Sequence, residues 1–375
     1  MSWSGICADR RLAYFWSALM LTAILGLTGG SVQLVHPQDS PITGAVNQNV
    51  TAIPGSLTGS SPVPESILER GRYLVEGPAH CFTCHSRVEW EGSNGEPSIE
   101  EKGAGRIWLA ERFPLLPEQE DLTGRDQWLG FQLRRQALIS PNITPDPETG
   151  AGNWSDETWR QAIREGVGQD GRTLSPAMPS QQFRKMSDED LASVISYLRS
   201  IPARQNPLPA RVLSGEILSK LHPLESVTEP VPVPDFSDPI NRGAYLVGLS
   251  NCRGCHSSFD EDFRPITELE FAGGSLLKGP WGEVTAPNLT SDRNGSSRYD
   301  VKTFIQVMRT GRVGKRSLNP VMPWASFRNM SDEDLTAIFA YLQTLKPTVH
   351  RVDNAVSPTL CSRCGKFHGD GDRNN

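Results

Sequence analysis

Apolar residues recur along much of this chain with the period of an α-helix, and few segments show the period-two alternation of a strand. The clearest helix is predicted directly after Ser187, because serine caps helix N-termini and acidic residues fill the following turn. One face of that helix carries Leu191, Val194, Ile195 and Leu198. Pro202 ends the pattern. The predicted fold class is therefore all-α.

The same succession of motifs occurs twice in the chain. The paired segments are RGRYLV at 70–75 with RGAYLV at 242–247, PNIT at 141–144 with PNLT at 287–290, MP at 178–179 with MP at 322–323, and MSDEDL at 186–191 with MSDEDL at 330–335. Each copy is about 110 to 135 residues long, which is too long for a solenoid repeat and suits a duplicated domain. We predict two tandem helical domains, at 65–205 and 239–347, joined by a proline-rich linker at 206–238.

The amino-terminal segment has the pattern of an export signal. Residues 12–35 contain no charge and follow Arg10 and Arg11. No A-x-A cleavage site follows, and the uncharged length approaches the roughly 20 residues that span a bilayer. Within residues 1–35 a retained membrane anchor is therefore favoured over a cleaved signal peptide. Residues 36–64 are rich in Pro, Gly, Ser and Thr and are predicted to be a flexible linker.

The charge balance argues against one class of partner. The chain has a formal net charge of −6 and no stripe of basic residues that could neutralise phosphates. Nucleic acid is therefore excluded as an expected partner.

Two cysteine motifs indicate the chemistry. Cys81 and Cys84 precede His85, and Cys252 and Cys255 precede His256, with the same spacing in both copies. This is the attachment pattern of c-type haem, in which the two sulfurs bind the haem edge and the histidine meets the iron. A disulfide or half of a zinc site would explain the cysteines, but not a histidine at the same offset twice. Two covalently bound haem c groups are predicted.

The second axial ligand of each iron is predicted to be a methionine. Met178 and Met322 each lie beside prolines, nine residues before the serine that is expected to cap the last helix of the copy. Prolines stiffen a loop, and a stiff loop can hold a thioether on iron. A lone methionine is usually core filler, but the matched position in both copies favours ligation.

Other side chains could take that ligand position. The alternatives are Met186, Met330, His222, His350 and His368, whereas His80 adjoins Cys81 and is not expected to reach the far face of the haem. The two methionines stand at expected helix starts, where inward packing is the simpler role, and a second histidine would lower the reduction potential.

Two further pairs of residues are candidates for haem contacts. Asn142 and Asn288 could hydrogen-bond a haem edge, although an Asx turn beside proline explains them equally well. Arg172 and Arg316 could pair with haem propionates, although exposed arginines are common.

The tail at 348–375 contains a third cysteine pair, Cys361 and Cys364, followed by glycine instead of histidine. In an oxidising compartment a local disulfide is the simplest expectation. A metal site with His368 is the alternative, but the sequence offers no evident fourth ligand.

Both copies resemble class I c-type cytochromes, and the pair is similar to the dihaem members of that group. The resemblance rests on CFTCH and CRGCH as attachment sites and on AMP and VMP as methionine loops, and it covers residues 65–200 and 239–347. It implies helical domains around covalent low-spin haem, and electron transfer. It further implies that Gly71 with Tyr73, and Gly243 with Tyr245, cross the final helix of their own copy.

The layout also resembles the cytochrome subunits that serve membrane-side alcohol and aldehyde dehydrogenases. The predicted function is a membrane-tethered electron relay on the periplasmic side of the bacterial inner membrane. Its expected donor is a dehydrogenase or a quinol-oxidising complex, and its expected acceptor is an oxidase or another cytochrome of a respiratory chain. The alternative is a dihaem enzyme, a peroxidase or a thiosulfate dehydrogenase, with one open or unusually ligated haem.

Overall fold

The computed structural model describes residues 66–88, 95–108, 138–209, 223–260, 265–279 and 282–369, and the statements below concern these residues. The predicted anchor at 1–35, the flexible linker at 36–64 and His222 lie outside them. Among the helices that are described, none has the length and apolar character needed to cross a membrane.

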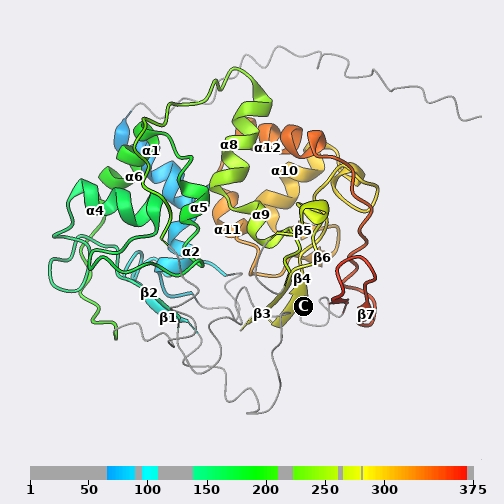
Figure 1. Cartoon of the computed structure of the whole chain (residues 1–375), viewed down its shortest axis with the longest axis horizontal. Helices are drawn as coiled ribbons and strands as arrows, with labels where there is room; N and C mark the ends of the chain where they lie inside the picture. Colours follow the sequence, from blue (N-terminus) through cyan, green and yellow to red (C-terminus); the bar gives the residue numbers. More distant parts are fainter. Residues whose placement is uncertain are drawn as a thin grey trace, which may run out of the picture. The chain divides into compact units, whose positions relative to one another are not determined.

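Each copy of the repeated sequence forms a similar set of helices (Figure 1). The first repeat contains α1 (Ile67–Glu76), α2 (Cys81–His85), α4 (Asp156–Arg160), which continues as the π-helical turn η1 (Gln161–Glu165), α5 (Ser180–Phe183) and α6 (Asp188–Ser200). The second repeat contains α8 (Pro239–Leu249), α9 (Cys252–Cys255), the 3₁₀ turns η2 (Thr267–Leu269) and η3 (Ser296–Arg298), α10 (Val301–Thr310), α11 (Trp324–Phe327) and α12 (Asp332–Thr344).

The predicted helix boundaries follow from local chemistry. The Ser187 side chain accepts a hydrogen bond from Asp190 N, and Ser331 does the same for Asp334 N. These N-caps satisfy backbone donors that the helix itself leaves unpaired. The middle helices end at Gly166 and Gly311, which adopt the left-handed conformation with φ of 65° and 63°. Both capping serines are in the places that the sequence predicts, and the two glycines end their helices in the same way.

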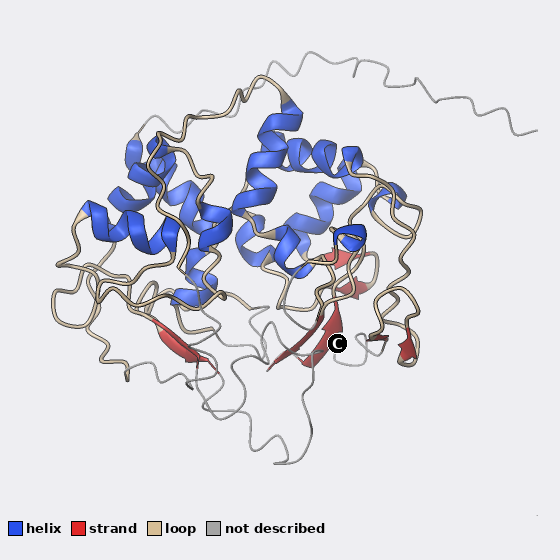
Figure 2. Ribbon diagram, in the orientation of Figure 1, coloured by secondary structure: helices blue, strands red, loops and turns tan. Residues whose placement is uncertain are grey.

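Short strands accompany the helices (Figure 2). Four two-stranded antiparallel sheets are described: β1 (Arg106–Trp108) with β2 (Leu138–Ser140), β3 (Leu276–Gly279) with β4 (Gly282–Thr285), β5 (Arg312–Val313) with β6 (Arg316–Ser317), and β7 (Thr359–Leu360) with β8 (Phe367–His368). The helical character expected from the sequence is confirmed, but the expectation of an all-α fold omitted these hairpins. Strands of two to four residues are too short to give a clear period-two signal.

The first and last helices of each repeat pack against each other, α1 on α6 and α8 on α12. Glycine permits the close approach. A Cβ atom at Gly71 would lie 2.6 Å from Tyr197 Cβ, and one at Gly243 would lie 2.8 Å from Tyr341 Cβ. The expected crossing at these two glycines is therefore present.

The tyrosines behind these glycines reach the other repeat. Tyr73 OH donates to Asp334 and accepts from Ser331 N at 3.1 Å. In the reciprocal contact, Tyr245 OH donates to Asp190 at 2.6 Å and accepts from the N–H of the opposite capping serine at 3.1 Å. Each hydroxyl thus joins the N-terminus of the partner repeat's last helix, rather than only crossing its own as the resemblance implied.

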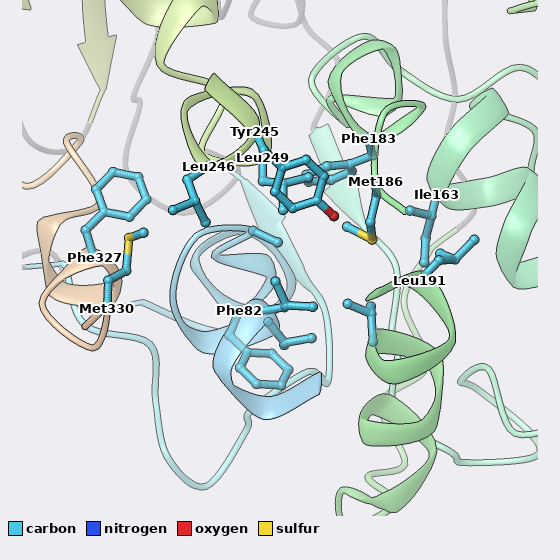
Figure 3. Close-up of a cluster of buried hydrophobic side chains, with 14 of the residues drawn as sticks. Phe82, Ile163, Phe183, Met186, Leu191, Tyr245, Leu246, Leu249, Phe327 and Met330 are labelled. Atoms are coloured by element: carbon cyan, nitrogen blue, oxygen red, sulfur yellow. The ribbon is translucent and has the colours of Figure 1, made fainter. Parts of the chain in front are cut away.

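Apolar side chains from both repeats form one buried cluster (Figure 3). Its labelled members from the first repeat are Phe82, Ile163, Phe183, Met186 and Leu191, and those from the second are Tyr245, Leu246, Leu249, Phe327 and Met330. Both repeats belong to a single compact unit. The position of one attachment motif is therefore linked to that of the other.

Candidate haem sites

Each C-x-x-C-H motif lies on a short helix that follows a sharp turn. The residue before the first cysteine is in the left-handed region in both repeats, with φ of 35° at His80 and 49° at Asn251. Asparagine and histidine are both enriched in this conformation, so both repeats can form the same turn. The turn separates α2 from the preceding helix α1, and α9 from the preceding helix α8.

The two motif histidines have identical supports. His85 Nδ1 lies 2.8 Å from Pro141 O, and His256 Nδ1 lies 2.8 Å from Pro287 O. A carbonyl accepts only, so Nδ1 carries the proton and Nε2 presents its lone pair. Burial lowers the pKa of both imidazoles, which keeps them neutral. A neutral imidazole held in one tautomer by an outer carbonyl is suited to bind a metal through Nε2.

The loops that supply these carbonyls are fixed by Asx turns. Asn142 Oδ1 accepts hydrogen bonds from Thr144 N at 2.9 Å and from its hydroxyl at 2.7 Å. Asn288 makes the same pair of bonds with Thr290, both at 2.8 Å. Both asparagines are buried. The Asx-turn interpretation is therefore the one that the structure supports, and these side chains serve the histidines indirectly.

The motif cysteines are suited to covalent attachment rather than to thiolate chemistry. Desolvation raises the pKa of Cys81, Cys252 and Cys255 to about 12. A thiol with so high a pKa is protonated at neutral pH, which argues against a redox-active dithiol at these motifs. The cysteines and histidine of each motif fit the two thioether bonds and one axial bond of haem c.

The methionine loops form matching turns. Met178 N donates to Ser175 O at 2.9 Å, and Met322 N donates to Asn319 O at 3.0 Å. Both side chains are partly buried and pack against the hydrophobic cluster, whereas Met186 and Met330 are each only 1% exposed. The rival methionines therefore fill the core, as their positions at helix starts suggested.

The rival histidines have other surroundings. The His80 ring packs edge-on against Phe327, with centroids 5.4 Å apart. His350 and His368 lie together beside the tail cysteines, with ring centroids 5.0 Å apart. Their neighbours are thus other than the methionine loops.

Arg106 is a site residue that the sequence analysis missed. Its charge interacts with Cys84, and burial lowers the pKa of its guanidinium to about 10. The only available signal was its place beside Ala104-Gly105, which parallels Ala272-Gly273. Arg172, by contrast, is exposed and pairs with Asp170 at 3.4 Å, and Arg316 lies in β6.

The two attachment motifs lie close to each other. Thr83 Oγ1 of α2 is 3.2 Å from Ser326 Oγ of α11, the helix that directly follows the second methionine loop. Burial and, second to it, repulsion between the ionised forms of Cys84 and Cys255 raise the pKa of Cys255, which places the two cysteines near each other. Cofactors on these motifs would therefore be near neighbours.

The C-x-x-C-H order, with the motif histidine held by a backbone carbonyl, is typical of one class of protein, those that bind haem covalently. The chain belongs to the cytochrome c family: the family model for cytochrome c matches residues 68–202 and 240–346. The family binds haem c covalently and transfers electrons, as the resemblance noted from the motifs implied.

Several characterised proteins are similar to this chain. It is 36% identical over 254 residues to one of the subunits of nicotinate dehydrogenase from Pseudomonas putida, a match that covers 62% of this chain and 20% of that protein. It is 30% identical over 357 residues to the cytochrome c subunit of the quinone alcohol dehydrogenase of Gluconobacter oxydans, covering 91% and 63%. The cytochrome c subunit of gluconate 2-dehydrogenase from Pantoea cypripedii is 33% identical over 326 residues, covering 79% and 64%. This chain thus spans less than two thirds of each of these relatives.

Proposed function

We propose that the chain carries two haem c groups, one in each repeat, and relays electrons between redox proteins. The observation that carries the proposal is the duplicated site: two C-x-x-C-H motifs whose buried histidines are each held by a proline carbonyl at 2.8 Å. One such site would suit many haem proteins. Two copies with matched loops suit a relay, because each would then hold its haem in similar surroundings that move little when the iron changes charge.

Each repeat supplies the ligands in the same order. The thioether bonds would come from Cys81 and Cys84 in the first repeat, and from Cys252 and Cys255 in the second. The axial ligands would be His85 with Met178, and His256 with Met322. Haem iron with both axial positions filled supplies reversible one-electron chemistry. The protein holds the ligands in place and excludes water, so that a change in charge requires little movement.

The contact between α2 and α11 supports transfer within the chain. Because Thr83 of the first motif lies 3.2 Å from Ser326 in α11 of the second repeat, the first motif is held against the second repeat by the protein core rather than by a flexible linker. Electrons entering at one repeat would have a short path to the other.

The partners are proposed from the relatives. The named cytochrome subunits belong to alcohol and gluconate dehydrogenases. We therefore propose a dehydrogenase or a quinol-oxidising complex as donor, and an oxidase or another cytochrome as acceptor. The chain would act as the cytochrome subunit of an oxidoreductase or as a carrier, on the periplasmic face of the inner membrane, with residues 1–35 as the anchor.

The ligand assignment is tested by Met178→Ala and Met322→Ala in the full chain. Electron paramagnetic resonance and near-infrared magnetic circular dichroism of the oxidised wild type should report two low-spin His/Met haems. Each variant should convert one haem to a high-spin form that binds carbon monoxide and has a lower potential. Met186→Leu and Met330→Leu are the matched controls and should leave both spectra unchanged, because those side chains lie in the core.

Two results would contradict the relay. An alanine variant with unchanged spectrum and potential would show that its methionine is not a ligand. A high-spin or His/His haem in the wild type would favour the dihaem enzyme, and peroxide and thiosulfate should then be assayed.

The anchor is tested separately, by alkaline carbonate extraction of membranes and by the mass of the mature chain. Retention in the membrane with residues 1–35 intact supports the anchor. Release of a chain that lacks them would show a cleaved signal peptide.

A further inference from the structure

Four side chains with metal-binding atoms converge in the tail, away from the haem motifs. They are His350, Cys361, Cys364 and His368, and one ligand atom from each lies within 4.8 Å of all the others. The two cysteines lie in the connection between β7 and β8, and both histidine side chains are buried. The sequence analysis lacked a fourth ligand for this cluster, and His350 provides it.

The distances suit a tetrahedral ion. His350 Nε2 is 3.4 Å from Cys361 Sγ, and His368 Nε2 is 3.1 Å from Cys364 Sγ. In a tetrahedral zinc site with bonds of about 2.0–2.3 Å, neighbouring ligand atoms are roughly 3.3–3.8 Å apart. The four atoms thus occupy nearly the volume that such a site requires.

Backbone carbonyls orient both rings toward the sulfurs. His350 Nδ1 lies 2.8 Å from Ala272 O, and His368 Nδ1 lies 3.3 Å from Arg351 O. The protonated Nδ1 faces the carbonyl, so Nε2 presents its lone pair to the cluster. A disulfide between the cysteines would give these two imidazole lone pairs no role.

The turn between the cysteines is closed by backbone hydrogen bonds. Cys361 N donates to Lys366 O at 2.8 Å, and Gly365 N donates to Cys361 O at 2.9 Å. Gly365 has a φ of 68°, which a side chain would disfavour. The structure describes both cysteines as free thiols rather than as the disulfide expected from the sequence.

A comparison of equivalent positions in the two repeats shows which residues of the second repeat form this cluster. Gly105 N and Gly273 N donate to the motif-histidine carbonyls at the same 2.8 Å, which makes these positions equivalent. Asn206 Nδ2 then donates to Ala104 O at 2.8 Å, where the second repeat uses His350 on Ala272 O. The histidine keeps the hydrogen bond and adds a ligand nitrogen.

The space for the cluster also comes from a substitution between repeats. Arg106 follows Gly105 in the first repeat, whereas Gly274 follows Gly273 in the second. A Cβ atom at Gly274 would lie 2.7 Å from His350 Cε1 and 3.5 Å from His368 Nε2. A larger residue there would push the imidazoles out of place.

We propose that His350, Cys361, Cys364 and His368 bind one structural zinc ion. Two cysteines and two histidines form a closed donor set typical of structural zinc, with no position left for substrate. The ion would fasten residues 350–368 to the loop behind the second haem motif. That loop already contacts the tail, because Asn288 Nδ2 donates to His350 O at 3.2 Å and Asn354 Nδ2 donates to Thr285 O at 2.9 Å.

The test uses the full holoprotein and zinc itself. Elemental analysis after dialysis should find one zinc per chain, independent of the iron content. Zinc K-edge absorption, which iron does not disturb, should report two sulfur and two nitrogen neighbours at about 2.3 and 2.0 Å.

The decisive variant is His350→Asn, which copies Asn206 of the first repeat and retains the hydrogen bond to Ala272 O. It should bind zinc at least about tenfold more weakly, as should Cys361→Ser, while the haem spectrum is unchanged. Ser362→Ala alters an exposed residue in the same turn and should retain zinc with wild-type affinity.

Three results would overturn the proposal. The first is a wild-type chain without zinc. The second is zinc that His350→Asn and Cys361→Ser bind as tightly as the wild type. The third is a tail peptide whose mass is lower by two hydrogens, which would show a Cys361–Cys364 disulfide in the isolated protein.

Discussion

The loop that carries the proline carbonyl is closed in different ways in the two repeats. In the first repeat, Asn142 Nδ2 donates to Arg204 O at 2.6 Å, and the chain then leaves along the linker. In the second repeat, Asn288 Nδ2 donates to Thr348 O at 2.9 Å and to His350 O at 3.2 Å, and the chain continues into the tail hairpin. The equivalent asparagines Asn142 and Asn288 therefore bind chain segments that are unrelated in sequence.

The comparison distinguishes the features that both candidate haem sites share from the features that differ between the repeats. Both repeats keep the histidine, the proline carbonyl, the Asx turn and the helix crossing at glycine. They differ at Arg106 against Gly274, at Asn206 against His350, and at His80 against Asn251. The shared features position the motif histidine, and the three differing positions lie outside the hydrogen bond that holds its ring.

The largest effect on this comparison should come from the shared helix crossings. Gly71→Ala and Gly243→Ala each place a methyl group against the backbone of the last helix, so each should destabilise the protein by about 3 kcal/mol or more. Gly248→Ala in α8 is the control, because nothing lies within 4 Å of its Cβ position, and it should stabilise by up to about 1 kcal/mol. Denaturant unfolding measures all three, and equal tolerance would contradict the close packing.

A difference between the repeats should appear in acid. Burial lowers the pKa of His80 from 6.5 to about 4, whereas the second repeat has Asn251 at this position. Between those pH values the unfolded chain binds a proton that the folded chain does not. Stability should therefore fall as pH decreases, with a slope of up to about 1.4 kcal/mol per pH unit.

The variant that tests this slope is His80→Asn, taken from the second repeat. Its stability should depend less on pH between 6.5 and 4 than that of the wild type. Asn251→Gln is the matched control and should leave the slope as it is. A slope that is the same in wild type and His80→Asn would exclude His80 as its source.

The reciprocal tyrosines should show that the two repeats hold each other equally. Tyr73→Phe removes a donor from Asp334, and Tyr245→Phe removes one from Asp190. Each should cost about 1–2 kcal/mol, because a buried carboxylate loses one hydrogen bond. The double variant should cost about the sum. Thermal unfolding measures this, and a loss confined to one tyrosine would contradict the symmetry of the contacts.

The smallest effect should come from the first repeat's counterpart of the tail site. Asn206→Ala removes the hydrogen bond to Ala104 O and should destabilise by about 1 kcal/mol, with no change in bound zinc. Asn206→His would restore a donor at that position without creating a zinc site, since no cysteines follow Asn206 as Cys361 and Cys364 follow His350. Zinc bound in addition to one ion per chain in this variant would show that the cysteines are dispensable.

The sequence alone determined the features that depend on near neighbours in the chain. Helical periodicity, the capping Ser187 and Ser331, and the terminating Gly166 and Gly311 are read within a few residues, because helix hydrogen bonds join residues four apart. The C-x-x-C-H motifs are also read within five residues, and their occurrence in both copies strengthened the prediction of haem attachment. The sequence did not predict the short hairpins, because strands of two to four residues are too short to show an alternating pattern.

Only the tertiary structure decided the contacts between distant residues. Pro141 O reaches His85 from 56 residues away, and Tyr73 reaches Asp334 across 261. His350 could not be assigned to the tail cysteines, because its ring is directed by the carbonyl of Ala272, 78 residues earlier. The spacing of residues in the sequence identifies a ligand set when all the ligands come from one short segment. When separate loops supply it, packing of the whole chain brings the atoms together.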